Sequence, residues 1–463
     1  YMDQMKRKAY KSDPVKSQLT HKQYAYGVRD YIKYEELIDS VRWDLKDFMN
    51  WISSDNERTK YKFLLEQYGY EKSDLSEIPK FTQNMIFYPT NKIRFYVNKE
   101  NVLNSGVVKK ENENLIVEYI DIDLPESGLY KNQILMLDIL SKNDWERPIY
   151  FTGGSYKDSE YLWMKNYLQL DGLVYKLVPI ETPLNPENPY QMGRIDANKM
   201  YEIVKKWKWG NSESDKIYHD PETRKNSITF RSNLHRLAEE FISLGDNFKA
   251  LEILDLSFEK LPIEYFGYYS LSEPYINSYY KIGEKEKSRN LFKKIEEKYH
   301  EQINYYSNSM ILNPNKFNLE IHAENIFTYN ERLRGLLENQ INIGEEKFVS
   351  EFIVKYIKST EIFKDLYGEY DFCNYMNSFI KPLYVSEKVS DARNLYEKIK
   401  SLIISRLNTL ISANDNPNSE YINDLITQEL EKYENLVNII SKFENKKYLD
   451  SEIIDYKKYY NQF

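Results

Sequence analysis

Apolar residues recur every three or four positions over most of the chain, which is the spacing typical of amphipathic helices. Near the N-terminal end this spacing runs from Tyr34 to Trp51, and we expect residues 1–80 to be helical throughout. The apolar positions in that stretch are Leu37, Val41, Leu45, Phe48 and Trp51.

Between residues 85 and 185 the pattern changes, because β-branched and aromatic residues gather in short runs that predict strands. The predicted strands are residues 92–97, 114–124, 147–152 and 173–180, and the predicted helices between them are residues 131–142 and 160–170. A proline-rich loop follows, and residues 196–209 are expected to form one more helix. The polar stretch 212–221 then marks a boundary. Beyond it the sequence predicts helix with few interruptions.

The last region carries a pattern that resembles tetratricopeptide repeats, in which a pair of packed helices recurs about every 34 residues. In the first unit, the small residues Ala238 and Ala250 allow two helices to approach closely, and Gly245 can adopt the left-handed turn between them. A second unit has Gly283 at the turn, and a weaker third unit has Glu387 where the turn glycine would stand. A generic helical array is the alternative interpretation.

Residues 300–370 fit no repeat. Because repeat arrays of this kind bind peptides or protein surfaces in a concave groove, the first helix of each unit supplies candidate binding residues. These candidates are Ser232, His235, Glu239, Asn277, Tyr280 and Lys281, and an ordinary solvated helix face is the alternative.

These patterns predict an α+β protein that is mostly helical. A helical segment over residues 1–84 is expected to pack on a small α/β module of residues 85–211, and residues 222–463 form the tetratricopeptide-like helical domain.

Composition excludes several classes of function. Asp and Glu number 72 against 64 Lys and Arg, a net charge of -8, so a nucleic-acid partner is not expected. The single Cys373 excludes an internal disulfide framework and is best interpreted as a buried thiol. No apolar run of 18 residues exists, and the charged start at Tyr1 lacks a signal peptide, so we expect a fragment of a longer protein or a processed one.

Few residues suggest chemistry. The five histidines show no i, i+4 pair of the kind that binds zinc on a helix, and Gly153 with Gly154 is too short for a phosphate loop, so neither a metal nor a cofactor site is predicted. Three aromatic residues of the segment 160–170 suit stacking on a sugar, with a place in the core as the alternative. They are Tyr161, Trp163 and Tyr167.

Three charged residues of the α/β module are candidate binding residues. Asp121 and Asp123 alternate along a predicted strand and would share one face, where paired carboxylates share a proton or bind a cation. A solvated strand face is the alternative. Arg147 precedes Pro148 and suits a clamp for a carboxylate or phosphate, or else it fixes the helix-to-strand turn through backbone carbonyls.

Several sequence words carry a family resemblance. They are Asn132-Gln-Ile-Leu-Met-Leu-Asp-Ile-Leu140, Asn143-Asp-Trp-Glu-Arg-Pro-Ile-Tyr-Phe151 and Tyr167-Leu-Gln-Leu-Asp-Gly-Leu-Val-Tyr-Lys-Leu-Val-Pro179, with Tyr1-Met-Asp-Gln-Met-Lys-Arg-Lys-Ala-Tyr10 and Gln18-Leu-Thr-His-Lys-Gln-Tyr24 before them. Over residues 1–210 the chain resembles the extramembrane part of a bacterial membrane-protein family of the protein O-mannosyltransferase-like glycosyltransferases in the GT-C superfamily.

The resemblance implies a membrane region preceding Tyr1 that uses a lipid-linked sugar donor and contains the catalytic residues, none of which can be placed in this chain. The chain itself would lie on the periplasmic side of the cytoplasmic membrane, in contact with its own membrane domain. It would bind an acceptor protein or peptide, or support the membrane region, and would be inactive alone.

Two other classes of function remain open at this point. One is a non-enzymatic tetratricopeptide-type scaffold that joins proteins of the cell envelope or the cytoplasm. The other is a hydrolase that uses Asp121 and Asp123 as its carboxylate pair.

Overall fold

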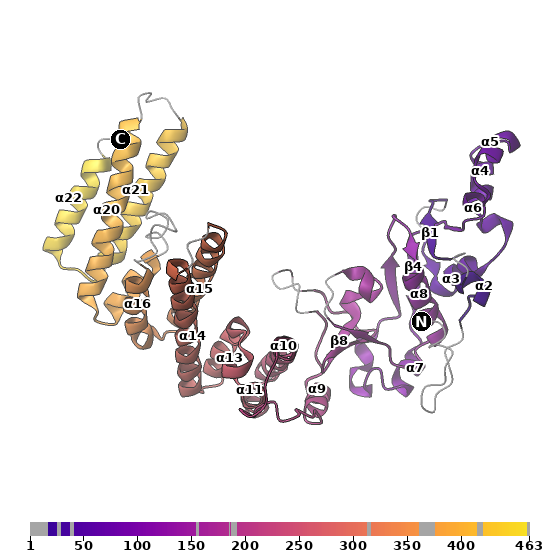
Figure 1. Ribbon diagram of the computed structural model, residues 1–463, viewed down its shortest axis with the longest axis horizontal. Helices are drawn as coiled ribbons and strands as arrows, with labels where there is room; N and C mark the ends of the chain where they lie inside the picture. The colour runs from indigo at the N-terminus through magenta and orange to yellow at the C-terminus, as the bar shows by residue number, and fades with distance from the viewer. Residues whose placement is uncertain are drawn as a thin grey trace. The chain divides into compact units, whose positions relative to one another are not determined.

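The structure is a computed structural model (Figure 1), and it describes residues 17–25, 29–37, 41–153, 157–184, 186, 192–312, 316–360, 376–413 and 420–460. The chain divides into two compact units. The first unit contains residues 1–214 with 239–244, and the second contains residues 215–238 with 245–463. Within the described residues the first unit mixes helices with strands and the second is helical, which confirms the predicted α+β, mostly helical class.

In the described part of the first unit, three small sheets of three strands each form the frame, in the orders β3-β1-β6, β2-β4-β5 and β7-β9-β8. The pairs β1–β3 and β2–β4 are parallel, and the other four pairs are antiparallel. The strands are β1 (Tyr31–Tyr34), β2 (Trp43–Asp44), β3 (Phe87–Tyr88), β4 (Lys92–Tyr96), β5 (Tyr119–Asp123), β6 (Leu129–Tyr130), β7 (Tyr150–Thr152), β8 (Leu168–Asp171) and β9 (Val174–Leu177).

The helices of the first unit are short, and α3 and α8 build much of its core. These two helices contact each other, and α3 also contacts β4. The α-helices are α2 (His21–Ala25), α3 (Leu45–Ser53), α4 (Tyr61–Gln67), α5 (Lys72–Glu77), α6 (Lys80–Gln83), α7 (Lys99–Asn104), α8 (Lys131–Asn143) and α9 (Ala197–Val204), and the 3₁₀ turns are η1 (Glu57–Thr59), η2 (Lys110–Leu115), η3 (Asp158–Tyr161) and η4 (Lys165–Tyr167).

The prediction of helix over residues 1–80 is wrong at β1 and β2. Ile32 of β1 lies opposite Leu129 of β6, and Trp43 of β2 lies opposite Ile93 of β4. Helix α3 begins only at Leu45, where the Asp44 side chain accepts a hydrogen bond from the Lys46 N–H at 2.7 Å. These strands have four and two residues, too few to show an alternating pattern, and their partners are distant in sequence.

The prediction of helix over residues 160–170 is also wrong, because the chain there forms two 3₁₀ turns and then β8. β8 and β9 make a tight hairpin in which Asp171 pairs with Val174. Gly172 has φ +72° at the first central position of the turn, a conformation that glycine adopts without strain. A Cβ at this position would also lie 3.0 Å from Cγ2 of Ile203.

A left-handed turn after α8 connects several elements of the first unit. Asp144 and Trp145 both have positive φ, at 42° and 64°. The Asp144 carboxylate accepts hydrogen bonds from the Asn98 and Asn101 side-chain amides at 2.9 and 3.3 Å and pairs with Lys46 Nζ at 3.1 Å. One aspartate therefore joins α8, α7 and α3.

Trp145 fills the core beside this turn. Its side chain is 2% exposed and stacks on Phe95 of β4 at 5.1 Å between ring centroids. Its indole Nε1 donates to the Tyr96 carbonyl at 3.2 Å, so a buried polar atom is satisfied. Residues 143–145 belong to one of the sequence words that carried the family resemblance, and here their role is structural.

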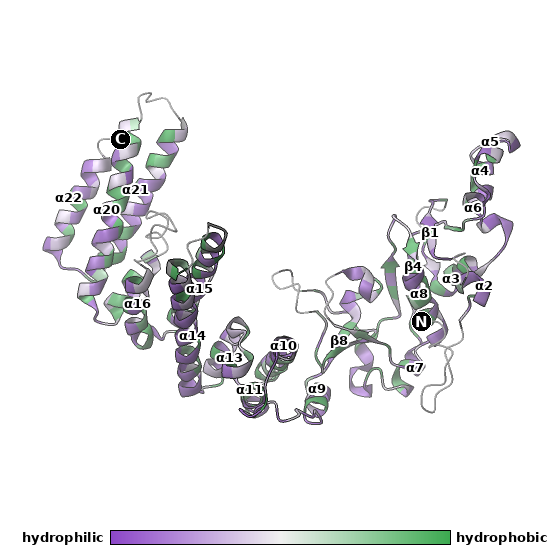
Figure 2. Cartoon of the chain, in the orientation of Figure 1, coloured by the Kyte–Doolittle hydropathy of each residue, from purple (hydrophilic) through white to green (hydrophobic). Residues whose placement is uncertain are grey.

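The second unit consists of amphipathic helices, which carry green and purple positions side by side in Figure 2. Its described α-helices are α10 (Pro221–Ser243), α11 (Asn247–Lys260), α12 (Ile263–Phe266), α13 (Glu273–Lys281), α14 (Lys285–Leu312), α15 (Lys316–Asn342), α16 (Glu346–Thr360), α19 (Ile380–Val385), α20 (Val389–Ala413), α21 (Glu420–Ile440) and α22 (Lys446–Tyr460), with the 3₁₀ turns η5 (Tyr269–Leu271) and η7 (Asn377–Phe379). Cys373 lies outside the described residues.

The predicted left-handed turns between paired helices are confirmed. Gly245, Gly283 and Glu387 have φ of 78°, 90° and 61°. Ala238 and Ala250 are both buried, each with 0% exposure.

A fourth turn of the same kind was not predicted. Gly344 has φ 84° and joins α15 to α16, in the region where the sequence fitted no repeat. The turn after α15 has the same hydrogen bonds as the turn after α13, from Gly344 N–H to the Ile341 carbonyl and from Glu345 N–H to the Gln340 carbonyl, each at 3.0 Å. The helical-hairpin pattern therefore continues through this region.

Truncating Trp145 tests its place in the core. We expect Trp145→Ala to lower the free energy of unfolding of the first unit by about 3–5 kcal/mol, because it removes a large buried side chain and leaves a cavity. Urea denaturation measures the change. Phe81→Ala in the same unit is the control, since Phe81 is 72% exposed and should change stability little. Equal losses for the two variants would contradict the assignment of Trp145 to the core.

The turn at Glu387 predicts a stabilising substitution. A non-glycine residue at positive φ costs about 1–2 kcal/mol, part of which glycine gives back through the unfolded chain, so Glu387→Gly should raise the free energy of unfolding by about 0.5–1 kcal/mol. Gly344→Ala should lower it by about 1–2 kcal/mol, although a Cβ there meets no atom within 4 Å. In thermal denaturation, the midpoint temperatures of the two variants should shift in opposite directions. Shifts in the same direction would refute the interpretation that both turns need a left-handed residue.

Candidate functional site

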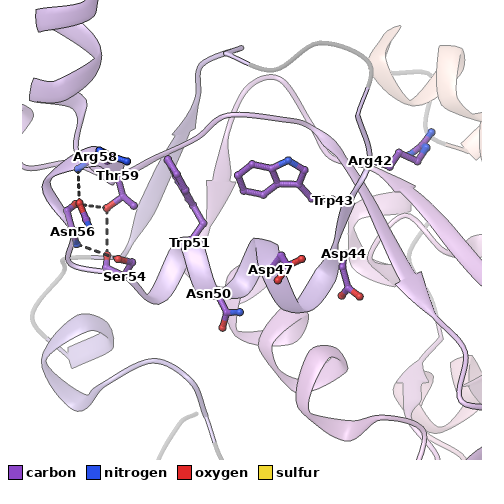
Figure 3. Close-up of a pocket in the computed structure, with 10 residues that line it drawn as sticks. All are labelled: Arg42, Trp43, Asp44, Asp47, Asn50, Trp51, Ser54, Asn56, Arg58 and Thr59. Carbon is purple, nitrogen blue, oxygen red and sulfur yellow. Dashed lines mark hydrogen bonds between the residues drawn. The ribbon is translucent and has the colours of Figure 1, made fainter.

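A groove of about 570 Å³ lies on the first unit, a volume in the range of small-ligand sites. It follows one side of α3 and continues into η1 (Figure 3). The residues that line it are Arg42, Trp43, Asp44, Asp47, Asn50, Trp51, Ser54, Asn56, Arg58 and Thr59.

Helix α3 presents one face to the core and another to the groove. Its Leu45, Phe48, Met49 and Ile52 are fully buried, with 0% exposure. Asp47, Asn50, Trp51 and Ser54 line the groove at spacings of three and four residues, which places them on one side of the helix. The amphipathic pattern of this helix therefore serves packing and the groove together.

Two tryptophans form the apolar wall of the groove. Trp43 comes from β2 and Trp51 from α3, and their rings meet edge to face with centroids 5.7 Å apart. Trp51 also packs edge to face on Phe87, and its Nε1 donates to the Phe87 carbonyl at 2.7 Å. Trp43 is half-exposed, and its Nε1 has no hydrogen-bond partner among the described residues. Trp51 is therefore held in place, while Trp43 has an indole N–H available to a ligand.

Arg29 fixes the C-terminal end of α3. Its guanidinium is 1% exposed and donates to the carbonyls of Ile52 and Ser54 at 2.8 and 3.0 Å. It also pairs with Asp55 at 3.2 Å. Burial lowers the pKa of Arg29, and the Asp55 charge acts in the opposite direction. A cation at this end of the helix satisfies its last carbonyls and complements its dipole.

The far end of the groove is a loop held by its own hydrogen bonds, drawn as dashed lines in Figure 3. The Asn56 side chain accepts from the Arg58 N–H at 3.0 Å, and the Asn56 N–H donates to Ser54 Oγ at 3.1 Å. Thr59 Oγ1 donates to the Asn56 carbonyl at 2.8 Å. These bonds turn the chain sharply and leave the Arg58 side chain exposed at the groove.

The residues that line the groove carry two charges of each sign, and one of them, Arg42, is also paired with Asp121 and Asp123 beside the groove. Asp44 and Asp47 contribute two negative charges, and Arg42 and Arg58 contribute two positive charges. Two amide side chains, Asn50 and Asn56, add hydrogen-bond donors and acceptors. This arrangement suits an uncharged ligand rich in hydroxyl groups better than an anion or a cation.

The predicted pair Asp121 and Asp123 does share one face of β5, as the alternation indicated. Both carboxylates face arginines: Arg94 binds Asp121 through Nε and Nη2 at 2.7 and 3.0 Å, and Arg42 lies 3.2 Å from Asp121 and 2.7 Å from Asp123. The hydrogen bonds to Asp121 raise the pKa of Arg94. The pair thus holds Arg42 at the edge of the groove, and a catalytic or ligand-binding role for it stays a prediction.

Arg147 is exposed, and its backbone carbonyl accepts a hydrogen bond from the Asn143 side chain at 2.8 Å. The side chain that fixes this turn is therefore that of Asn143, and both roles considered for the Arg147 side chain stay predictions. Of the three aromatic candidates, Tyr161 lies in the core with 1% exposure and packs against Phe151 and Tyr175.

The candidates of the helical domain differ in their surroundings. His235 packs against α13, with its Nε2 2.9 Å from Ser278 Oγ and its ring 4.8 Å from that of Tyr275. This packing favours a structural role for His235. Ser232 and Lys281 are exposed, Asn277 and Tyr280 are half-buried, and Glu239 lies in the short stretch assigned to the first unit. Peptide binding by these residues stays a prediction.

A hollow of about 250 Å³ in the second unit is lined by other residues, from α11 to α14. At its wall Asp255 accepts a hydrogen bond from Tyr279 at 3.0 Å and pairs with Lys287 at 2.6 Å. No group of three or more His, Cys, Asp or Glu side chains that could hold a metal occurs in the described part of the chain. Among the described helices, none is both long and apolar enough to cross a membrane.

The groove was not predicted from the sequence. Trp51 was expected in the apolar stripe of a long helix, and no role was predicted for Trp43. The available signal was the set Trp43, Asp47, Asn50 and Trp51, in which two tryptophans flank polar residues at helical spacing.

Comparison with known families relates the first unit to a described domain. Residues 1–199 match the family described as TMEM260-associated domain 2. The name relates this part of the chain to a membrane-protein family. The matched residues include all those that line the groove.

Curated proteins give no match. Among solved structures, a protein titled "Circular tandem repeat protein with novel repeat topology and enhanced subunit contact surfaces" shows 13% identity and a TM-score of 0.16. The alignment covers 58% of this chain and 52% of that chain, so this chain spans about half the length of that protein.

Replacing Arg29 tests how the groove is held. We expect Arg29→Ala to lower the free energy of unfolding by about 2–4 kcal/mol, because the buried Ile52 carbonyl and the half-buried Ser54 carbonyl lose their donor. Hydrogen exchange should speed up at the amides of residues 50–54. Arg58→Ala, which removes an exposed arginine of the same groove, should leave exchange there unchanged. Unchanged exchange in both variants would show that Arg29 does not fix this end of α3.

Proposed function

We propose that this chain is the extracytoplasmic part of an integral-membrane glycosyltransferase, and that its first unit binds the carbohydrate of a glycosylated acceptor. Two observations support the proposal: the match of residues 1–199 to a domain associated with a membrane-protein family, and the groove in that same region. The single observation on which the binding role rests is the pair of tryptophans in a groove without net charge.

The chemistry of the groove fits a sugar. The faces of aromatic rings are electronegative and attract the C–H groups of a pyranose, so tryptophan offers a flat apolar surface for it. Asp47 and Asn50 lie on the helix side of the same groove and can accept or donate hydrogen bonds to hydroxyl groups. The free Nε1 of Trp43 adds a donor. A charged lipid or a nucleic acid would be attracted less strongly, because the groove carries equal numbers of acidic and basic side chains.

The transfer reaction is assigned to the membrane part of the protein. The sequence resemblance implies a lipid-linked sugar donor and catalytic residues there, and a location on the periplasmic side of the cytoplasmic membrane. In this account the chain holds the acceptor near the membrane site and does not itself catalyse transfer.

A second candidate function is protein binding by the helical domain without any link to sugar transfer. The repeated left-handed turns at Gly245, Gly283, Gly344 and Glu387 support it, since they indicate successive helical hairpins of the kind found in binding scaffolds. The two functions are compatible, because the groove and the hairpins belong to different units.

A binding experiment with the whole chain tests the proposal. Calorimetric titration with an O-mannosylated threonine peptide should give saturable binding, and the same peptide without sugar should bind at least about tenfold more weakly. Trp43→Ala should lower the affinity for the glycopeptide about tenfold or more, because it removes the apolar surface on which the sugar lies, and a tenfold change corresponds to about 1.4 kcal/mol.

The control is Phe81→Ala, which removes an exposed aromatic side chain outside the groove and should keep the wild-type affinity. Circular dichroism of each variant verifies that the fold persists. Equal affinity for peptides with and without sugar would overturn carbohydrate recognition, and wild-type affinity in Trp43→Ala would overturn the assignment to this groove.

A further inference from the structure

A second hollow of the first unit, separate from the groove in all its lining residues, is surrounded by cations. Its volume is about 60 Å³, and four of its lining residues are basic: Lys109, Lys176, Arg194 and Lys199. The chain as a whole has a net charge of -8, so such a cluster is not a product of overall composition. The remaining lining residues are Gly106, Val107, Val108, Asn112, Gln169 and Asp196.

The backbone places Arg194 firmly at this hollow. The Arg194 N–H donates to the Leu168 carbonyl and its own carbonyl accepts from the Leu170 N–H, both at 2.9 Å, so this residue pairs with the edge of β8. Gly193 makes the approach possible, because a Cβ there would lie 2.7 Å from the Leu168 oxygen and its φ is +72°. Arg194 therefore sits on a rigid strand edge.

Lys176 is the buried member of the cluster. It lies on β9, is 5% exposed, and its Nζ is 3.3 Å from Asp171 Oδ2. The other carboxylate oxygen of Asp171, Oδ1, accepts a hydrogen bond from Gln169 Nε2 at 2.8 Å. Burying an ammonium group is costly unless its hydrogen bonds are made, and the one ion pair leaves donors of Lys176 at the hollow that it lines.

The carboxylates near the hollow do not balance its cations. Asp196 lies 3.4 Å from Lys109 Nζ and also caps α9 by accepting a hydrogen bond from the Lys199 N–H at 3.0 Å. With Asp171, that makes two carboxylates against four cations. Among the described residues, the Arg194 guanidinium and the Lys199 ammonium have no carboxylate partner. The N-terminus of α9 adds its own positive end to the same place.

We infer that this hollow binds a phosphate group, either as a free anion or as part of a phosphorylated ligand. The guanidinium of Arg194 suits two oxygens of a tetrahedral oxyanion, and Lys176 and Lys199 can each reach another as point charges. The space is several times the roughly 10–15 Å³ that one water needs on the same measure, and so it holds a small oxyanion rather than a large ligand. This inference is independent of the proposed carbohydrate site.

Titration of the whole chain with inorganic phosphate and with pyrophosphate at low ionic strength tests the inference. We expect one saturable site in the wild-type protein, weakened by added salt because the attraction is electrostatic. Arg194→Gln and Lys199→Gln should each weaken binding about tenfold, since each removes a charge-assisted hydrogen bond. Lys206→Gln removes an exposed lysine just after α9 with the same change of charge, and it should bind as the wild type does.

A chemical readout accompanies the titration. Saturating phosphate should protect Lys199 from acetylation by an amine-reactive reagent, as measured by mass spectrometry, while Lys206 reacts as before. Equal binding by Arg194→Gln, Lys206→Gln and wild type, or labelling of Lys199 that phosphate does not change, would overturn the inference.

Two further arms separate the sources of the phosphate. Vesicles of phosphatidylcholine with phosphatidic acid should retain the chain through this site if a lipid headgroup is the ligand, with loss of retention in Arg194→Gln but not in Lys206→Gln. If the vesicles retain both variants equally and the wild-type chain still binds inorganic phosphate in the titration, the ligand is a free phosphate or a small phosphorylated molecule. Failure of the carbohydrate experiment leaves both arms unaffected.

Discussion

The left-handed turn at Asp144 and Trp145 is the constraint on which the first unit depends. Its carboxylate binds α7 and the start of α3, and its indole fills the core against β4. Arg29 then holds the opposite end of α3 through two carbonyls. Helix α3 is thus fixed at both ends, and its outer face, with Asp47, Asn50 and Trp51, becomes a rigid wall of the groove. Preorganised side chains of this kind bind with a smaller loss of conformational entropy.

The parts of the fold that were predictable are those with long local patterns. Helix α8 and strand β4 follow directly from their apolar spacing, and the turns at Gly245 and Gly283 follow from glycine beside small helix-contact residues. β1, β2 and β8 were missed because strands of two to four residues depend on pairing with distant segments. At β8 a local signal did exist, since Asp171-Gly172 is a favoured hairpin dipeptide.

Neither candidate site was predictable from the sequence, because the tertiary structure brings the residues of each site together. Trp43 and Trp51 approach each other only because β2 pairs in parallel with β4 and leads straight into α3. The cation hollow gathers Lys109, Lys176 and Arg194 from segments far apart in the chain. By contrast, Asp121 and Asp123 were visible as a pair, and the structure shows them bound to Arg42 and Arg94. Alternation placed them on one face, but their partners depend on the register of β4.

The central claim is that the Trp43 indole contacts a sugar. The most direct measurement is an NMR spectrum of the chain labelled with ¹⁵N in its six tryptophans, recorded during titration with a mannosylated peptide. The indole signal that is missing from the Trp43→Phe variant should shift as the glycopeptide is added and should stay in place with the bare peptide. A glycopeptide that leaves this signal unmoved, or that moves only the signals of other tryptophans, would show that Trp43 does not contact the sugar.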